Sequence, residues 1–279
     1  MRKFFSKRSL ADAVITYAIL IIVCLIFVFP VFWIVISSFS KSGSIYDYDG
    51  FFPKSLSVQS YVTLFTDTKM YDYPNWLKNT LFVAVMSSFL GTIMVTLTAY
   101  TISRFEFKSR KLLMKTTLVL GMFPGFMGMT AIHLIMINFK LINNLWSLIL
   151  ISASTAPMGY LVQKGFFDTI SGTIYEAARI DGATNLTIFR RITLPLAKPI
   201  LVYTALTQFA WPWSDFLLPK MLLKNKDLWT VAVGLTSLDE TEFTRFAAGS
   251  VFIAVPIVIL YFCLSRFLVM GVSSGAVKE

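Results

Sequence analysis

Long apolar stretches alternate with short polar ones along almost the whole chain. A bilayer core about 30 Å thick needs roughly 20 helical residues at 1.5 Å each. Stretches of that length occupy residues 14–38, 79–102, 112–138, 145–166, 196–218 and 247–270. The pattern predicts an all-α polytopic membrane protein with about six transmembrane helices.

The spans divide the chain into five parts. They are an N-terminal segment (1–13), a first helix (14–38), a polar loop (39–78), a five-helix core (79–270) and a short tail (271–279). Loops 39–78 and 219–246 are rich in turn residues, and they either fold as small caps or fray. Pro124-Gly125 interrupts the third span, as either a functional break or a packing kink.

Lys and Arg are distributed unevenly between the two sides that these spans define. Sixteen of the 25 fall in one set of segments and nine in the other. The richer set contains the N-terminus, the segments around 104–115 and 164–198, and the tail. Because cytoplasmic loops carry the excess of Lys and Arg, both termini are predicted to be cytoplasmic and loop 39–78 extracytoplasmic.

Composition supports a membrane protein and excludes several other classes. Hydrophobic residues make up 56% of the 279 residues and charged residues 14%. The net charge of +10 sits in short runs beside apolar stretches, which favours membrane topology over nucleic-acid binding. Cys24, Cys263 and the single His133 have no partners at metal-ligand spacing, so no metal site and no catalytic group is predicted. The first apolar run is too long for a removable signal peptide, and a retained span is expected.

Residues 168–195 form a segment on the basic side that is too long for a simple turn. Thr173 and Glu176 match a capping box, which predicts a short helix from Ile174. Gly182 is placed to end that helix in the left-handed conformation. Thr184 or Asn185 can cap a second short helix through Arg191, and Pro195 suits the first turn of the next span.

Local chemistry leaves two interpretations of the first short helix open. Ala177 and Ala178 let the helix approach another surface closely, while Ile174, Tyr175 and Ile180 offer apolar area. These features fit an amphipathic helix lying on the lipid surface. They fit a helix that docks on a partner protein equally well.

The spacing in this segment resembles a family signature. Glu176-Ala177-Ala178, then Gly182, then Ile192-Thr193-Leu194-Pro195 is similar to the EAA loop of type I ABC importer permeases. The resemblance covers nearly the whole chain and is nearest to the smaller permease subunit of maltose-type importers. Met122-Phe123-Pro124-Gly125, Phe246-Ala247-Ala248 and the ending Gly271 to Lys278 also look alike.

The resemblance implies a type I ABC importer permease fold and a set of partners. They are a second homologous permease, two cytoplasmic ATPases, an extracytoplasmic sugar-binding protein and the lipid bilayer of a prokaryotic cell membrane. The sequence lacks the G-x-x-x-x-G-K-[ST] phosphate loop, so ATP and Mg would be bound by the ATPase partners, and this chain is not expected to be an enzyme or to hold a cofactor. The residues implied for ATPase coupling are Glu176, Ala177, Ala178, Asp181, Gly182, Ile192, Leu194 and Pro195.

The fifth span is the most polar candidate for lining a transport pathway. Gln208, Trp211, Trp213 and Asp215 stand close together there, and Pro124 is added from the third span. Aromatic faces and a carboxylate suit a hydroxyl-rich sugar, although the Trp pair also fits an interfacial aromatic belt. The resemblance implies an oligosaccharide, most closely a maltodextrin. The alternatives are an ABC permease for another solute class and an ion-coupled secondary transporter, against which the absence of an internal repeat counts.

Overall fold

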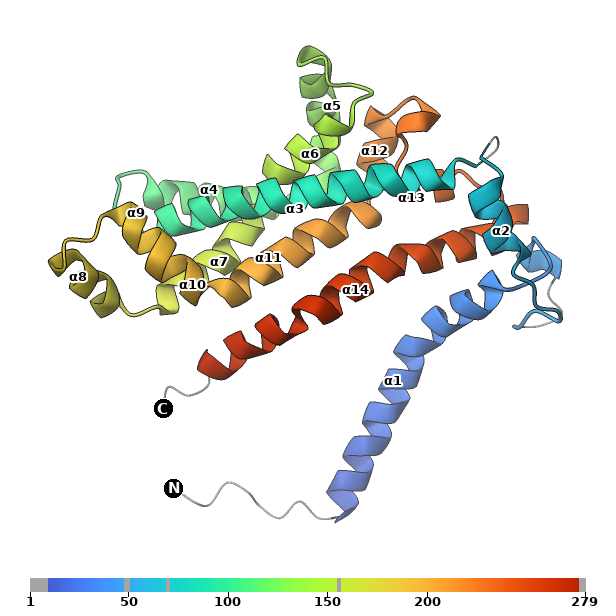
Figure 1. The fold of residues 1–279 in the computed structure, drawn as a ribbon, viewed down its shortest axis with the longest axis horizontal. Coiled ribbons are helices and arrows are strands. Elements are labelled where there is room, and N and C mark those ends of the chain that lie inside the picture. The colour runs from blue at the N-terminus through green and yellow to red at the C-terminus, as the bar shows by residue number, and fades with distance from the viewer. Residues whose placement is uncertain (1–9, 48–50, 69–70, 155–156, 276–279) are drawn as a thin grey trace. The chain divides into compact units, whose positions relative to one another are not determined.

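The computed structural model describes residues 10–47, 51–68, 71–154 and 157–275. Within these ranges the regular elements are helices, and the β pairing is limited to an isolated bridge between Ser40 and Leu56. The all-α prediction is confirmed. The chain divides into two compact units, residues 1–70 with 238–252 and residues 71–237 with 253–279 (Figure 1). Of the predicted N-terminal segment 1–13, positions 1–9 lie outside the described residues.

The α-helices follow one another along the chain. They are α1 (Leu10–Ser38), α2 (Gln59–Thr66), α3 (Tyr73–Arg104), α4 (Arg110–Gly121), α5 (Met129–Asn138), α6 (Leu145–Ser154), α7 (Pro157–Thr169), α8 (Gly172–Ile180), α9 (Asn185–Ile188), α10 (Leu194–Leu196), α11 (Lys198–Ala210), α12 (Leu217–Leu222), α13 (Val231–Leu235) and α14 (Phe243–Gly275). Short 3-10 turns occupy η1 (Ile45–Asp47), η2 (Gly125–Gly128), η4 (Trp211–Trp213), η5 (Lys226–Leu228) and η6 (Glu240–Glu242), and η3 (Phe189–Thr193) is a π turn.

The first unit folds the loop after α1 into a cap. Tyr61 and Phe65 of α2 place their rings 5.7 and 4.9 Å from the ring of Phe252, in the first turns of α14. Trp33 of α1 lies 5.5 Å from Phe243, ring to ring. Aromatic pairs at these separations stabilise a fold beyond the area that they bury. Of the two alternatives for loop 39–78, its described residues therefore follow the folded one.

Helix α1 carries its apolar residues around its whole circumference. Its large side chains are exposed in the isolated chain along most of its length, and Phe27 is 75% exposed. A helix that is apolar on every face needs lipid or another protein around it. This exposure agrees with the prediction that residues 14–38 cross a bilayer.

Helix α3 is the central element of the second unit and contacts α6, α7 and α11. Its buried face is lined largely by small side chains, among them Ala84, Ser87, Gly91 and Ala99. Small residues let helices approach closely in a membrane, where packing rather than hydrophobicity holds them together. Of the two candidate sites described below, the first is bonded to the C-terminal end of α3, and a lining residue of the second packs against Gly91.

The third predicted span breaks at Pro124. The helical pair α4 and η2–α5 is bent by 101°. Proline cannot donate the backbone hydrogen bond that would continue the helix, and Pro124 takes an extended conformation before η2. A Cβ placed on Gly125 would meet nothing within 4 Å. The break therefore faces open space in this chain, and the choice between a functional break and a packing kink stays a prediction.

The predicted fifth span over 196–218 is not one unbroken α-helix. Helix α11 ends at Ala210 after 13 residues, and the chain continues through η4 before α12 begins at Leu217. Pro212 is the physical reason, because its ring and missing N–H end the α-helical ladder. A helix of 13 residues covers about 20 Å, which is short of a bilayer core.

Span length can be tested directly on the described helices. Three of them are long and apolar enough to cross a membrane alone, namely Asp12–Ser38, Tyr73–Arg104 and Glu240–Ser265. The number rises to five if the bent pairs α4 with α5 and α6 with α7 each count as one span. The count of six stays a prediction. Predicted tail 271–279 begins as the last turn of α14, and positions 276–279 lie outside the described residues.

The N-terminal end of α3 is covered by residues of the predicted loop 219–246. Asn79 donates from Nδ2 to the carbonyl oxygens of Asp227 and Trp229, at 2.8 and 3.0 Å. The indole of Trp76 lies against Gly234, where an added Cβ would stand 2.0 Å from Cε3 of the ring. Only glycine allows this approach, so this part of the loop folds as a cap.

Candidate functional site: a docking segment and a polar cavity

The docking segment, residues 168–195, contains the predicted short helix, but the helix begins earlier than expected. Helix α8 starts at Gly172 with Ser171 as its N-terminal cap residue, and no side chain bonds to the free backbone N–H groups of its first turn. The hydroxyls of Ser171 and Thr173 bond to each other at 2.7 Å. The capping box between Thr173 and Glu176 is therefore absent, because Thr173 already lies inside the helix.

Gly182 ends α8 as predicted. Its φ is 81°, in the left-handed region that glycine adopts without strain. The N–H of Gly182 bonds to the carbonyl of Arg179 at 3.0 Å, and the N–H of Ala183 bonds to that of Ala178 at 2.9 Å. This pair of bonds is the Schellman motif, which satisfies the last carbonyls of a helix and turns the chain sharply.

Helix α8 has an inward and an outward face. Tyr175 and Ala178 are 5% and 9% exposed and belong to an apolar cluster with residues of α3, α7 and α9. Glu176, Ala177 and Ile180 form the outward face, and Ile180 is 86% exposed. Two expectations are corrected, because Tyr175 and Ala178 pack inside this chain and offer no surface to a partner.

A second helical stretch follows the bend and continues into α11. The side chain of Thr184, one of the two predicted caps, accepts from the N–H of Thr187 at 3.3 Å and begins α9. The π turn η3 then replaces the α-helix that was predicted through Arg191. Because Pro195 has no N–H to donate, an α ladder cannot run through this point unbroken.

The remaining residues of the predicted coupling set divide between surface and core. Asp181 and Pro195 are exposed, and Leu194 is partly buried. Ile192 is also partly buried and packs against the same apolar cluster as Ala178. Some residues of the predicted coupling set therefore pack inside the docking segment, and others are exposed on its surface.

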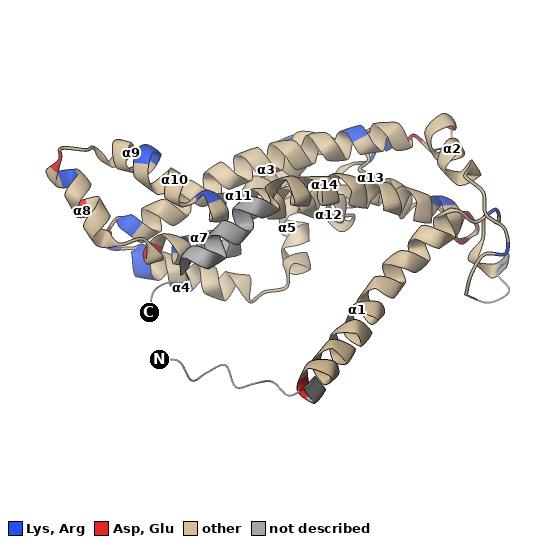
Figure 2. Ribbon diagram, turned by 60° about the horizontal axis from the view of Figure 1, so that its bottom comes forward, with Lys and Arg blue, Asp and Glu red and all other residues tan. Residues whose placement is uncertain are grey.

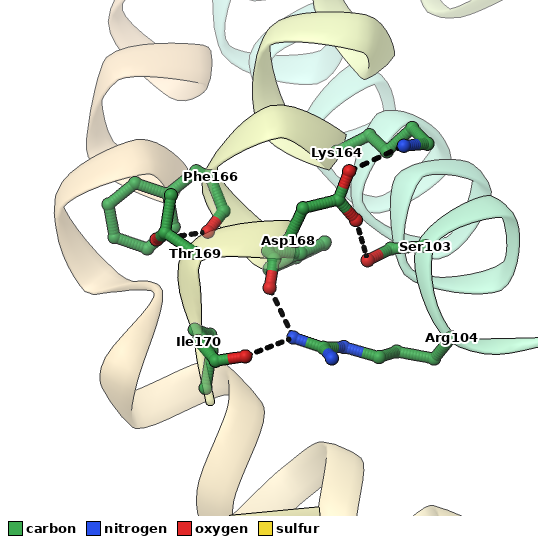
Figure 3. A network of polar contacts seen from close by, with 8 residues as sticks. Ser103, Arg104, Lys164, Phe166, Asp168, Thr169 and Ile170 are labelled. Atoms are coloured by element: carbon green, nitrogen blue, oxygen red, sulfur yellow. Dashed lines mark hydrogen bonds and ion pairs between the residues drawn. The ribbon is translucent and has the colours of Figure 1, made fainter. Parts of the chain in front are cut away.

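Polar contacts fix the start of the docking segment to the end of α3. Asp168 accepts a hydrogen bond from the Ser103 hydroxyl at 2.6 Å and forms an ion pair with Lys164 (Figure 3). Arg104, the last residue of α3, donates from Nη2 to the carbonyl oxygens of Phe167 and Ile170. Sequence reasoning missed Ser103 and Arg104, because no motif near them indicates that they bond to residues more than 60 positions later.

The second candidate site is a cavity of about 460 Å³ in the second unit. Its lining comes from η2, α5, α6, α7, α11, η4 and α12 and from the connection between the last two, and consists of Gly125, Met129, Ile132, Ile151, Ser152, Gly159, Thr207, Gln208, Trp211, Asp215 and Leu218. Apolar walls with a few polar groups are the usual composition of a ligand cavity.

Three of the five predicted pathway residues line this cavity. They are Gln208, Trp211 and Asp215, and Trp211 is 64% exposed. Trp213 is 1% exposed and packs beside Phe209 in the core, so its assignment to the pathway is wrong. The 3-10 turn separates the two tryptophans by about 240°, which sends them in different directions.

Two further features of the cavity concern predicted and missed residues. Pro124 itself is not in the lining, although its neighbour Gly125 is. Ser152 and Thr207 add hydroxyls that sequence reasoning did not single out. Gly91 of α3 makes room for a lining residue, because an added Cβ would stand 3.1 Å from Cδ of Gln208.

Comparison with known proteins shows the family of the chain. Residues 91–277 match the family described as binding-protein-dependent transport system inner membrane component. The chain belongs to that family, so it is the membrane-embedded permease of an importer of the ABC class. The matched range includes both the docking segment and the cavity.

Individual relatives match almost from end to end. The maltodextrin transport system permease protein MdxG of Bacillus subtilis is 34% identical over 98% of this chain and 99% of its own. The maltodextrin permease MalD of Streptococcus pneumoniae is 32% identical over 98% and 97%, and the galactooligosaccharide permease GanQ of Bacillus subtilis 32% over 94% of each.

Solved structures share the fold. A chain of a bacterial ABC transporter involved in alginate import superimposes with a TM-score of 0.78, at 22% identity, over 94% of this chain and 98% of that one. The permease fold expected from the sequence is confirmed by this likeness.

Proposed function

We propose that this chain is one of two permease subunits of an oligosaccharide importer and forms half of the translocation pathway. The relatives described above are named as permeases for maltodextrins and for galactooligosaccharides. A maltodextrin is the substrate that these relatives favour. The observation that carries the proposal is the helix α8, which ends in a Schellman motif at Gly182 and whose outward face remains exposed.

In this proposal α8 docks on a cytoplasmic ATPase subunit. The alkyl side chain of Ile180 would fill an apolar depression, and Ala177 beside it would allow close approach. Glu176 adds a carboxylate for a basic partner group, and Gly182 sets the angle of the helix. ATP and Mg would be bound by two such ATPase subunits, whose closure on nucleotide would move α8.

The docking segment lies on the cytoplasmic side in this proposal. Basic positions gather at the end of the second unit that carries α8, α9 and the start of α4 (Figure 2). That is the side on which Lys and Arg accumulate in membrane proteins. Both chain termini would then be cytoplasmic, in the inner or plasma membrane of a prokaryotic cell.

The cavity would be this subunit's share of the sugar pathway. The exposed indole of Trp211 offers a flat apolar face for a pyranose ring, and Gln208 and Asp215 offer hydrogen-bonding groups for its hydroxyls. The second permease subunit would close the side of the cavity that is open in this chain. An extracytoplasmic binding protein would deliver the sugar to this chamber.

The proposal is tested with the whole complex in liposomes: this chain, its partner permease, both ATPase subunits and the binding protein. We expect ATP hydrolysis to rise when the binding protein is loaded with maltotriose, and labelled maltotriose to accumulate. A parallel series with galactooligosaccharides identifies the other glycan class. Hydrolysis that responds to no sugar would overturn the substrate class, and failure to copurify with the ATPases would overturn the subunit assignment.

A further inference from the structure

The end of α3 makes a contact with α8 that the signature of the docking segment does not include. The guanidinium carbon of Arg104 lies 4.0 Å from the centre of the Tyr175 ring. Tyr175 is 5% exposed and is the largest inward side chain of α8. A planar guanidinium over an aromatic face combines cation–π attraction with stacking, which becomes stronger away from water.

Arg104 also holds the chain that leads into α8. Its Nη2 donates to the carbonyl oxygens of Phe167, in the last turn of α7, and of Ile170, just before α8 (Figure 3). One side chain therefore contacts α7, the connection and α8 at once. A lysine in its place has neither the planar face nor the fork of donors that these contacts use.

Tyr175 extends the same contact to the far side of the bend. Its hydroxyl lies 3.2 Å from Oγ1 of Thr193, in the π turn that leads to α11. Tyr100, one turn before the end of α3, packs on Phe189 of that turn with ring centres 4.6 Å apart. The docking segment is thus attached to α3 both before and after the bend at Gly182.

We propose that Arg104 is a positioning residue for transport. By clamping Tyr175 and the carbonyls that precede α8, it makes α8 and the end of α3 move together when an ATPase pushes on α8. Without it, the Gly182 bend and the connection after α7 would absorb part of the displacement. The displacement would be felt at the cavity, because the middle of α3 packs at Gly91 on the lining residue Gln208. This inference rests on the proposed docking of α8.

The experiment measures sugar transported per ATP hydrolysed by the complete complex in liposomes, with maltotriose and the binding protein. For Arg104→Gln we expect that ratio to fall about fivefold, while ATPase subunits still copurify. Arg104→Lys should give a smaller loss, and Tyr175→Phe, which keeps the ring, should stay near wild type. Lys108→Gln removes an exposed charge from the same end of the unit and serves as the matched control.

The outcomes separate the inference from the function on which it depends. A purely structural role would lower yield and transport together and leave the ratio unchanged. If Arg104→Gln transports as much sugar per ATP as the wild type, the inference is overturned. If Arg104→Gln does not assemble, an unchanged amount of sugar per ATP in Arg104→Lys overturns it instead. A wild-type chain that fails to bind the ATPases, or whose hydrolysis ignores every sugar, overturns the proposed function instead.

Discussion

The docking segment and the cavity differ in how their parts are brought together. The docking segment is one continuous run of residues, and its caps and bend are set by neighbours within a few positions. The cavity walls come from several helices and turns, as far apart in the chain as Gly125 and Leu218. The shape of the first site is therefore set by local backbone conformation, although α3 holds it in place, and the second site depends on how several helices pack together. Substitutions should separate the two by what they damage.

Changing Gly182 to Val should have the largest effect. A β-branched residue at a φ of 81° costs about 1–2 kcal/mol or more, and it would disturb the Schellman motif that aims α8. We expect sugar-stimulated ATP hydrolysis to fall by about tenfold or more, measured in liposomes. The matched control is Gly172→Ala, because Gly172 has an equally open site without a positive φ. Equal activity of the two variants would contradict a role for the bend.

The two faces of α8 can be separated next. Ile180→Asp places a charge on the outward face and should weaken ATPase copurification, while the yield and thermal stability of this chain stay unchanged. Ala178→Leu adds volume to the inward cluster and should cost about 1–3 kcal/mol through overpacking. Its effect would appear first as a lower melting temperature. The same loss pattern for both variants would contradict the division of faces.

The two tryptophans of η4 test the cavity in a similar way. Trp213→Ala removes a ring that is 1% exposed, and we expect about 3–5 kcal/mol of destabilisation. Trp211→Ala should leave the melting temperature within a few degrees of wild type and raise the sugar concentration needed for half-maximal uptake. Uptake unaffected by Trp211→Ala would remove this residue from the pathway.

The smallest expected effect comes from Gly91. An alanine there brings Cβ to 3.1 Å from Cδ of Gln208, a flexible side chain that can shift by a few tenths of an ångström. We expect a change of about twofold in apparent sugar affinity with full expression. Gly165→Ala, where an added Cβ meets nothing within 4 Å, is the control. A change of the same size in both variants would contradict contact between α3 and the cavity wall.

These contrasts also explain what the sequence could foresee. The left-handed Gly182 and the Thr184 cap were predictable because their causes are local. The inward orientation of Ala178 and the burial of Trp213 were not, since both depend on contacts with distant helices. The premature end of α11 had a local signal in Pro212, but hydropathy alone continued across it. Arg104 had no local signal, because its partners lie more than 60 positions later.

The two faces of α8 have a consequence for how such importers diverge. Tyr175 and Ala178 are constrained by the fold of this chain, whereas Glu176 and Ile180 would be constrained by another gene product. A permease that acquired a different ATPase would need compensating changes only at the second pair. Among orthologues, substitutions at positions 176 and 180 should therefore correlate with substitutions in the ATPase. Substitutions at positions 175 and 178 should show no such correlation.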